Sequence, residues 1–380
     1  MNFVILKTVN ATSNAKLWFK AGPTIAAMIL LAQEANSQNL VWANSYSGIS
    51  VSALEETEGV LADNSGNVFV TGLSGAKGTA STIRTMKLDA NGNVVWNVSH
   101  SRASLCGGMW GRTPLAMDGA GNLIVVGAEF NGAMDNWNPV LLKLSASTGT
   151  TLARWTFALG PYASFDAVVV DGADFYILAH NNPNNGNPHV VHTLKLASDG
   201  SIVWTDSFCP NIFWGTRGGI VVSSSRVCSA AGGRVMAQAL NGDVLWEKEM
   251  SLPNGGSALA ADGNGNIYLA EQNGVARLSP DGNLLGMLTG IAGSVSDLDI
   301  DASGNIYLVG STASSRSGSD ILVQKYSAFG SLVWNVTHGK NGPYSDDGIA
   351  ITVRGGYLYV GGSKYNKNLD MCTLKYSAGN

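Results

Sequence analysis

The stretch that decides the fold, residues 301–334, reads DASGNIYLVGSTASSRSGSDILVQKYSAFGSLVW. Its apolar run at 306–310 follows the turn-forming cluster Ser-Gly-Asn, which is typical of a buried strand. Two further apolar runs, 321–326 and 332–336, are separated by Ala-Phe-Gly, and an alternating segment that ends at Ile300 precedes the first turn. Short strands joined by short turns predict a four-stranded antiparallel meander.

The same unit recurs along the chain, which indicates a repeat architecture. The turn sequence Asp-x-x-Gly-Asn begins at Asp63, Asp118, Asp262 and Asp301, and the copy around residues 220–246 is degenerate. Most copies carry a tryptophan at a fixed place in the fourth strand. Counting these places gives seven copies: Trp42, Trp96, Trp155, Trp204, Trp246, Gly286 and Trp334.

The two ends of the chain complement each other. The last copy, residues 349–375, stops before its fourth strand, whereas residues 39–44 have the sequence of a fourth strand with no partners before them. A ring whose final sheet is completed by the N-terminal strand explains both features and removes exposed sheet edges. We therefore predict an all-β fold, a seven-bladed β-propeller of four-stranded antiparallel blades, the last blade closed by the N-terminal strand.

The repeat has a family resemblance. The pattern Gly-x-Asp-x-x-x-x-Lys-Tyr-x-x-x-Gly-x-Leu-x-Trp at residues 318–334, with the Asp-Asp pair and the Asp-x-x-Gly-Asn-x-Tyr hairpin, resembles the SBBP-type β-propeller repeats of secreted bacterial proteins. The resemblance covers most of the chain from residue 39 onward. It implies a propeller and an extracellular compartment, and it brings no shared catalytic residues.

Length and composition fit a single ring. A propeller accommodates 380 residues as one domain, for which we predict the bounds 38–380. Charged residues make up 13% of the chain, against about 25% in typical globular proteins. The net charge of −4 and the lack of a Lys/Arg run in the sequence predict no nucleic-acid partner.

The N-terminal segment has the features of a targeting signal. Lys16 and Lys20 precede an apolar run, residues 25–32, which is too short to span a membrane and is followed by small residues. We expect residues 1–37 to be a signal peptide, with no transmembrane span, and the protein to be secreted or at the cell surface, in the bacterial extracellular space or periplasm. The alternative is an N-terminal helix packed on the ring.

Secretion makes a disulfide permissible among the four cysteines. Cys106, Cys209, Cys228 and Cys372 permit three pairings, of which the pair Cys209 and Cys228, close in sequence, is favoured. Buried free thiols are an equal alternative. The cysteine spacing does not match a zinc site.

The repeated turn residues are interpreted as structural, because a turn that recurs needs the same geometry each time. Asp262-Gly-Asn-Gly-Asn imitates the start of a calcium-binding EF-hand loop, but Ile267 stands where that loop requires glycine and Asn273 where it requires glutamate. No metal site and no cofactor are therefore assigned there.

The loops on the opposite face differ from copy to copy, and variable loops on a rigid scaffold are where binding usually resides. Aromatic residues outside the repeated tryptophan position suit stacking on a sugar ring or a peptide, with polar neighbours supplying hydrogen bonds. They also suit filling gaps between blades. The candidate ligand-binding residues are Trp110, Arg112, Asp135, Trp137, Trp214 and Arg217.

Acidic residues gather near the starts of the innermost strands, where carboxylates could converge on a cation in the channel. The candidates are Asp166, Asp297, Asp346 and Asp347, with Glu56 and Glu58 nearby. The alternative is that these carboxylates accept hydrogen bonds from the backbone of neighbouring blades. His180, His189 and His192 have no spacing that defines a metal geometry.

Taken together, the sequence predicts a non-catalytic scaffold that binds a glycan, peptide or protein through the variable loops. Two alternatives stay open. One is a propeller enzyme, similar to quinone-dependent dehydrogenases in the Asp-x-x-Gly-x-x-x-Trp turn or to polysaccharide lyases, although the sequence contains no recognised catalytic motif. The other is a purely structural spacer.

Overall fold

The computed structural model describes residues 38–48, 53–76, 82–100, 103–104, 114–130, 137–182, 189–209, 218–250, 258–271, 274–313, 318–339, 344–366 and 368–379. All of them belong to the second of the chain's two units, Asn36–Asn380, and the first unit is Met1–Ala35. The expected signal peptide, residues 1–37, lies outside the described residues. In the described part every regular element is a strand, and no helix there could cross a membrane.

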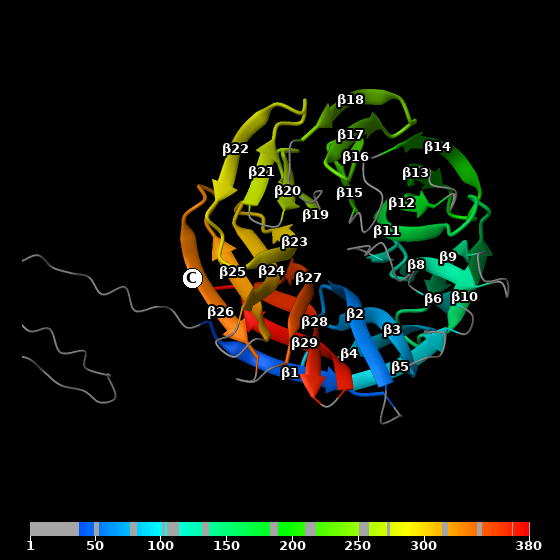
Figure 1. Cartoon of the computed structure of the whole chain (residues 1–380). Coiled ribbons are helices and arrows are strands. Elements are labelled where there is room, and N and C mark those ends of the chain that lie inside the picture. Colours follow the sequence, from blue (N-terminus) through cyan, green and yellow to red (C-terminus); the bar gives the residue numbers. More distant parts are fainter. Residues whose placement is uncertain are drawn as a thin grey trace, which may run out of the picture. The chain divides into compact units, whose positions relative to one another are not determined.

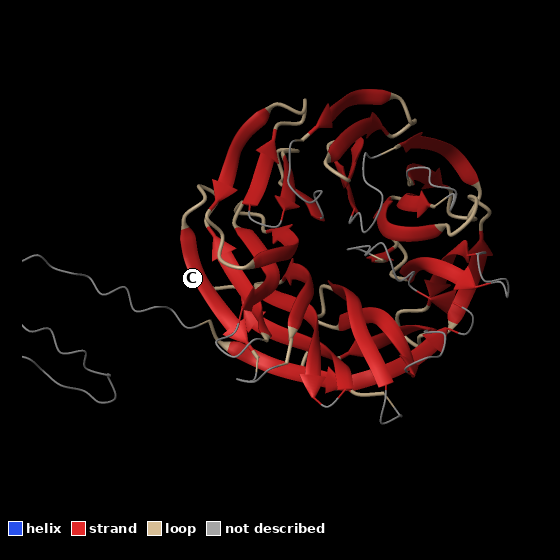
Figure 2. Ribbon diagram, in the orientation of Figure 1, coloured by secondary structure: helices blue, strands red, loops and turns tan. Residues whose placement is uncertain are grey.

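The strands form seven blades arranged as a ring, and Figure 2 shows the ring built from strands and loops. Each blade is an antiparallel sheet whose first strand faces the channel and whose last strand lies at the periphery (Figure 1). In blade two β6 and β7 share the place of the first strand, because both pair with β8. Blades one to four are β2 (Ala53–Ala62), β3 (Val68–Ala76), β4 (Thr82–Leu88) and β5 (Val94–His100); β6 (Ala103–Ser104), β7 (Leu115–Met117), β8 (Leu123–Phe130), β9 (Trp137–Leu144) and β10 (Thr151–Thr156); β11 (Ser164–Asp171), β12 (Asp174–Asn181), β13 (Val190–Leu196) and β14 (Ile202–Phe208); and β15 (Gly218–Ser223), β16 (Arg226–Ala231), β17 (Arg234–Ala239) and β18 (Val244–Glu249). Blades five to seven are β19 (Ala258–Ala261), β20 (Ile267–Glu271), β21 (Gly274–Leu278) and β22 (Leu284–Thr289); β23 (Ser294–Ile300), β24 (Ile306–Ala313), β25 (Ser319–Tyr326) and β26 (Leu332–His338); and β27 (Asp347–Arg354), β28 (Tyr357–Asn366), β29 (Asn368–Ser377) and β1 (Leu40–Tyr46).

The N-terminal strand closes the ring, as the sequence predicts. β1 pairs antiparallel with β29, and Trp42 lies opposite Lys375 in the register. The backbone N–H of Ser377 also donates to the carbonyl of Asn39 over 3.2 Å. The two ends of the described chain therefore make the last blade together, and the predicted seven-bladed, four-stranded propeller is confirmed.

The hydrophobic core is divided among the interfaces between blades. Alternate residues of a strand point to opposite faces of its sheet, so each blade contributes one face to each neighbour. The apolar clusters of the described residues follow this rule: one joins Tyr307 of blade six with Leu374 of blade seven, and another joins Phe69 of blade one with Leu142 of blade two. The ring thus replaces a single central core with a series of sheet-on-sheet contacts.

A repeated tryptophan contact links the periphery of neighbouring blades. The indole Nε1 of Trp42 donates to the carbonyl of Ala90 over 3.0 Å, and its ring lies on Gly92, which has a φ of 85°. A Cβ at Gly92 would come within 2.8 Å of the indole, so both the turn and the packing require glycine. The same indole hydrogen bond joins Trp96 to Ala146, Trp204 to Leu240 and Trp246 to Pro280.

The favoured disulfide is wrong. Cys209, Cys228 and Cys372 are free thiols, and Cys106 lies outside the described residues. Cys228 is on β16 and packs among Ala230, Val235 and Leu259 between blades four and five, whereas Cys209 follows the outermost strand of blade three and is exposed. Closeness in sequence does not bring the two together, because Cys228 lies on the second strand of blade four whereas Cys209 follows the outermost strand of blade three.

Candidate functional site

The turns between the first and second strands form one mouth of the channel. Asp63 Oδ1 accepts the N–H groups of Ser65 and Asn67, each over 2.9 Å, and Oδ2 accepts the Asn67 side-chain amide over 2.7 Å. Asp262 makes the same contacts with its own turn; burial opposes its ionisation, yet hydrogen bonds from Asn266 hold the pKa of its carboxyl below the ordinary value. These carboxylates accept bonds from the protein itself, which confirms their structural interpretation.

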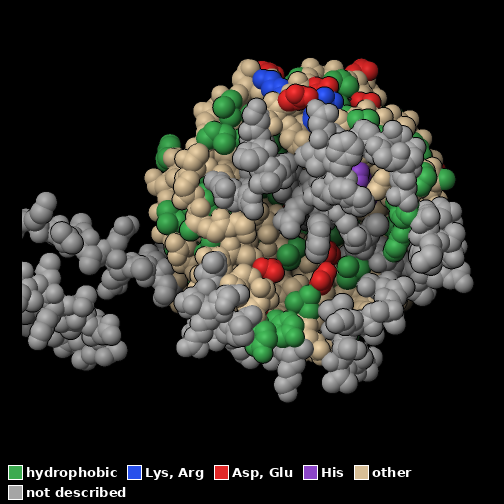
Figure 3. All heavy atoms as spheres, viewed as in Figure 1, with side chains coloured by type: hydrophobic (Ala, Val, Ile, Leu, Met, Phe, Trp, Pro, Cys, Tyr) green, Lys and Arg blue, Asp and Glu red, His purple; other side chains and the backbone are tan. Residues whose placement is uncertain are grey.

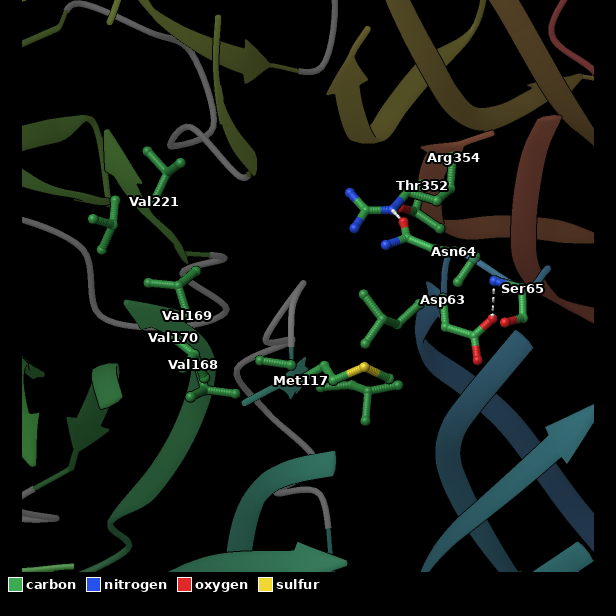
Figure 4. Close-up of a pocket in the computed structure, with 15 residues that line it drawn as sticks. Asp63, Asn64, Ser65, Met117, Val168, Val169, Val170, Val221, Thr352 and Arg354 are labelled. Atoms are coloured by element: carbon green, nitrogen blue, oxygen red, sulfur yellow. Dashed lines mark hydrogen bonds between the residues drawn. The ribbon is translucent and has the colours of Figure 1, made fainter. Parts of the chain in front are cut away.

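A cavity of about 650 Å³ lies at this mouth (Figure 4). The ends of the first strands of five blades build it, and ten of the fifteen described residues that line it are apolar, among them Leu61, Met117, Val169 and Val221. Its size is within the range of ligand pockets. Among the described residues that line it, only Asp63 and Arg354 carry a charge. The Asp63 carboxylate already accepts hydrogen bonds from its own turn.

Arg354 supplies the positive charge of the cavity. It ends β27, and its Nε donates to Asn64 Oδ1 of blade one over 2.9 Å. Figure 4 shows the guanidinium and the Asn64 amide side by side at the edge of the space. Within the described residues Arg354 forms no ion pair. Its remaining N–H groups are therefore available to donate hydrogen bonds to water or to a ligand in the cavity.

Asp299 lies behind this arginine and stabilises the seam between blades six and seven. Its Oδ2 accepts the N–H of Val353 over 2.8 Å, and its Oδ1 accepts that of Ile300. Burial raises the pKa of Asp299, against these hydrogen bonds and the positive charge of Arg354. Because Asp299 is occupied by backbone donors, it anchors the strand that carries Arg354 and leaves the guanidinium available.

The predicted channel carboxylates are each occupied by protein donors. Asp297 is buried, accepts the N–H of Ile351 over 2.9 Å, and has a pKa well above the ordinary value because of that burial. Asp346 accepts the N–H of Tyr365 over 2.9 Å. Asp347 accepts the hydroxyl groups of Ser311 and Ser319 over 2.7 and 2.9 Å. Only the bond to Asp297 comes from the backbone of a neighbouring blade, as the alternative interpretation states; Asp347 accepts from side chains of blade six, and Asp346 from the backbone of its own blade.

The fourth predicted carboxylate, Asp166, belongs to a histidine-rich corner of blade three. Its Oδ2 lies 2.7 Å from His180 Nδ1, and both side chains are buried. The ring of His189 stacks on that of His180 with centroids 6.3 Å apart, and burial, aided by His180, lowers the pKa of His192. Among the described residues no three or more His, Cys, Asp or Glu side chains are placed to hold a metal ion. The corner therefore presents an imidazole oriented by a carboxylate.

The predicted loop-face residues fall largely outside the described part of the chain. Trp137 is described: it begins β9, pairs with Phe130 in the register and is half-buried. Trp110, Arg112, Asp135, Trp214 and Arg217 lie outside the described residues. Figure 3 shows carboxylate side chains near the middle of this face and a mixed-charge cluster at its upper edge, over blade four, where Arg234 forms ion pairs with Glu247 and Glu249.

The sequence carried a signal for Arg354 that motif reasoning missed. In β23 the bulge precedes Asp297, and in β27 it precedes Ala350, so Arg354 stands where the repeat has the turn residue Asp301. A cation in place of a repeated acid is a departure from the repeat that alignment of the copies exposes. Asn64 has no such signal, because it is simply the second residue of a common turn.

Comparison with known proteins supports the architecture. No family model matches the chain, and no curated protein matches it. Among solved structures, it resembles the catalytically inactive virginiamycin B lyase from Staphylococcus aureus with quinupristin, at 11% identity and a TM-score of 0.58 over 88% of this chain and 98% of that one. It also resembles the WD40 propeller domain of Doa1, at 12% identity and a TM-score of 0.56 over 90% and 98%. Sqt1 from Chaetomium thermophilum, bound to the N-terminus of ribosomal protein L10, matches at 13% identity and a TM-score of 0.50 over 85% and 97%. At these identities the likeness establishes the propeller fold.

Proposed function

We propose that this protein is a non-catalytic propeller scaffold that binds a carboxylate-bearing segment of a partner polypeptide at the mouth of its channel. The observation that carries the proposal is the apolar cavity of about 650 Å³ with Arg354 at its edge. A guanidinium pairs well with a carboxylate, and the apolar walls suit the body of a peptide. The solved structure of Sqt1 with a protein N-terminus supports a peptide as ligand for a propeller of this kind.

The test uses Arg354→Gln, with Arg234→Gln as the matched control because Arg234 is also surface-lying and lies in blade four, outside the cavity. Random peptides with free C-termini are selected on the wild-type protein, and the enriched peptides are titrated by fluorescence anisotropy. A charge-assisted hydrogen bond contributes about 1.5–3 kcal/mol, so Arg354→Gln should weaken binding roughly 10- to 100-fold. Arg234→Gln should change it little. Selected peptides that bind both variants equally well would refute the channel mouth as the site.

The loop face is the second surface for the same function, as the sequence predicts. Its aromatic residues suit a glycan or a peptide, and Trp137 is the one among them that the structure describes. The triple substitution of Trp110, Trp137 and Trp214 by alanine should abolish binding at that face. If it leaves every ligand found by glycan and peptide arrays bound as before, the loop-face proposal is wrong.

We also propose that the protein is secreted or displayed at the cell surface. The charged and apolar pattern of residues 1–37 and the resemblance to repeats of secreted proteins support this. Sequencing of the mature N-terminus from culture medium, periplasm and cell fractions tests it. We expect a new N-terminus close to Ser37; a cytoplasmic protein that starts at Met1 would contradict the proposal.

An enzymatic function is the second candidate, favoured by the 2.7 Å contact between Asp166 and His180. Such a pair orients an imidazole as an acid or base, and one of the solved structures that this chain resembles is a lyase. Incubation with quinupristin and with a polysaccharide panel, followed by mass spectrometry, tests it, with His180→Ala as the inactive control. A quinone-dependent activity is tested by dye reduction with pyrroloquinoline quinone and calcium. Product formation that persists in His180→Ala would exclude this pair as the catalytic centre.

A further inference from the structure

Between blades five and six the described residues lack the repeated tryptophan contact. Gly286 pairs with Arg277 in the register just as Trp204 pairs with Lys195 and Trp334 with Lys325, so it occupies the repeated tryptophan position. A Cβ at Gly286 would meet no atom within 4 Å. The outer strand of blade five, β22, therefore places no indole against blade six.

The receiving turn of blade six is nevertheless built as in the other blades. Gly330 has a φ of 82°, and its N–H donates to the Ser327 carbonyl over 2.8 Å. In the other blades a Cβ on the equivalent glycine would lie within about 2.4–3.1 Å of an indole, whereas at Gly330 the nearest atom is Leu288 Cδ1 at 3.6 Å. The slot is present, and no tryptophan of the described chain fills it.

An open cavity of about 320 Å³ lies at this place. Tyr268, Leu288 and Ile306 form its floor and walls, and Arg277 and Ala328 bring polar groups to it. Arg277 turns back toward Asp262, 3.3 Å away, and stacks over the ring of Tyr268.

The hydrogen-bond acceptor that an indole needs is also in place. In four of the other slots, those of Trp42, Trp96, Trp204 and Trp246, a turn carbonyl accepts the indole N–H, as Ala90 does from Trp42. Ala328 is two residues before Gly330, as Ala90 is two before Gly92, and within the described residues its carbonyl accepts no hydrogen bond. The cavity thus offers the same acceptor that four sister slots use.

The rim of the slot carries an independent sign of an aromatic partner. Phe329 is 97% exposed, and the equivalent turn residue in the other five complete blades is polar: Asn91, Thr148, Asp199, Asn241 and Asp281. Leu284 and Leu285 of β22 are 57% and 52% exposed and continue the apolar rim. A fully exposed phenylalanine is informative where isolated aliphatic residues are not. The missing indole and the added phenyl ring occur at one interface.

We propose that this slot between blades five and six is a binding site for a tryptophan side chain presented by a partner polypeptide. The incoming indole takes the place of the missing ring, lies on Gly330 and donates its N–H to the Ala328 carbonyl. The guanidinium of Arg277 lies beside it and can contact its π face. Phe329 and the exposed leucines contact the residues that flank the tryptophan. This site is separate from the channel mouth and does not depend on that proposal.

The test titrates a fluorescein-labelled Gly-Gly-Trp-Gly-Gly peptide, with Gly-Gly-Leu-Gly-Gly as the control peptide, by fluorescence anisotropy. We expect saturable binding of the tryptophan peptide, at least tenfold tighter than that of the leucine peptide. Gly286→Trp should abolish binding and raise the melting temperature, because it supplies the missing indole in cis. Phe329→Ser, at a fully exposed position where folding is not at risk, should weaken binding several-fold.

Three results would overturn the proposal. The first is no binding to the wild-type protein, and the second is undiminished binding to a folded Gly286→Trp variant. The third is competition by free indole at the same concentration as the peptide, which would make the occupant a small molecule. Trp246→Gly opens the equivalent slot between blades four and five and serves as the positive control: binding to this variant but not to the wild type would show that the first result is not a failure of the assay.

Discussion

Trp42 provides the sharpest test of how the ring is closed. In Trp42→Ala the closing strand keeps its backbone pairing with β29 but loses the indole that rests on Gly92 and donates to Ala90. A tryptophan buries about 150–250 Å², and Trp42 belongs at the lower end because it is half-buried. At about 25 cal/mol per Å² this corresponds to about 4 kcal/mol, with about 1 kcal/mol more for the hydrogen bond. The Ala90 carbonyl keeps a second donor, Lys375 Nζ at 3.1 Å, so no buried acceptor is orphaned and the total should be about 3–5 kcal/mol.

The assay is equilibrium unfolding in guanidinium chloride, followed by circular dichroism, with Trp246→Ala as the matched control. Trp246 makes the same contacts with Gly282 and Pro280, but in a blade made of consecutive strands. Both variants should lose similar stability. If Trp246→Ala is destabilised by about 3–5 kcal/mol and Trp42→Ala by less than about 1 kcal/mol, the N-terminal strand contributes little to closure in solution and the reasoning fails.

Three further predictions concern buried groups. Burial lowers the pKa of His100 from 6.5 to about 4, so only the unfolded chain binds a proton between these values and stability falls as pH drops through 6.5. Between pH 8 and pH 5 the loss should be about 2 kcal/mol in thermal or denaturant unfolding, and His100→Gln should remove it; an unchanged slope in that variant would assign the effect elsewhere. Asp297→Ala leaves the buried N–H of Ile351 without its acceptor and should cost about 2–4 kcal/mol, whereas a change within about 0.5 kcal/mol would show that water replaces the carboxylate. Iodoacetamide should label exposed Cys209 in the native protein and Cys228 only after unfolding, because burial raises the pKa of the Cys228 thiol to about 12; mass spectrometry that finds the two joined would contradict the structure.

The repeat made the fold predictable from the sequence. Turn residues such as Gly92 and Gly304 have positive φ, and the neighbouring aspartates satisfy the turn N–H groups, so these choices are local and recur in several copies. The unmatched fourth strand at residues 39–44 and the incomplete last copy predicted the closure correctly, because a sheet edge needs a partner.

Interactions between blades were harder to predict from the sequence. The carboxylate of Asp297 is bonded to a backbone N–H that is 54 residues away in the chain, and a composition or spacing argument contains no measure of that distance. The favoured Cys209–Cys228 pair failed for a related reason, since 19 residues of separation in a meander do not fix which sheet face a side chain takes.

The sequence by itself determined the number of blades, the strand order within each and the way the ring closes, because these follow from short-range turn chemistry and from a repeated tryptophan. Only the tertiary structure decided which departures from the repeat create sites. Arg354 supplies the positive charge of a cavity because the first strands of five blades meet around that cavity. Gly286 leaves an empty slot because the next blade retains the turn that receives an indole in other blades. Both sites are made by residues of different blades, and the positions of blades relative to one another are set by packing between sheets rather than by neighbours in the chain.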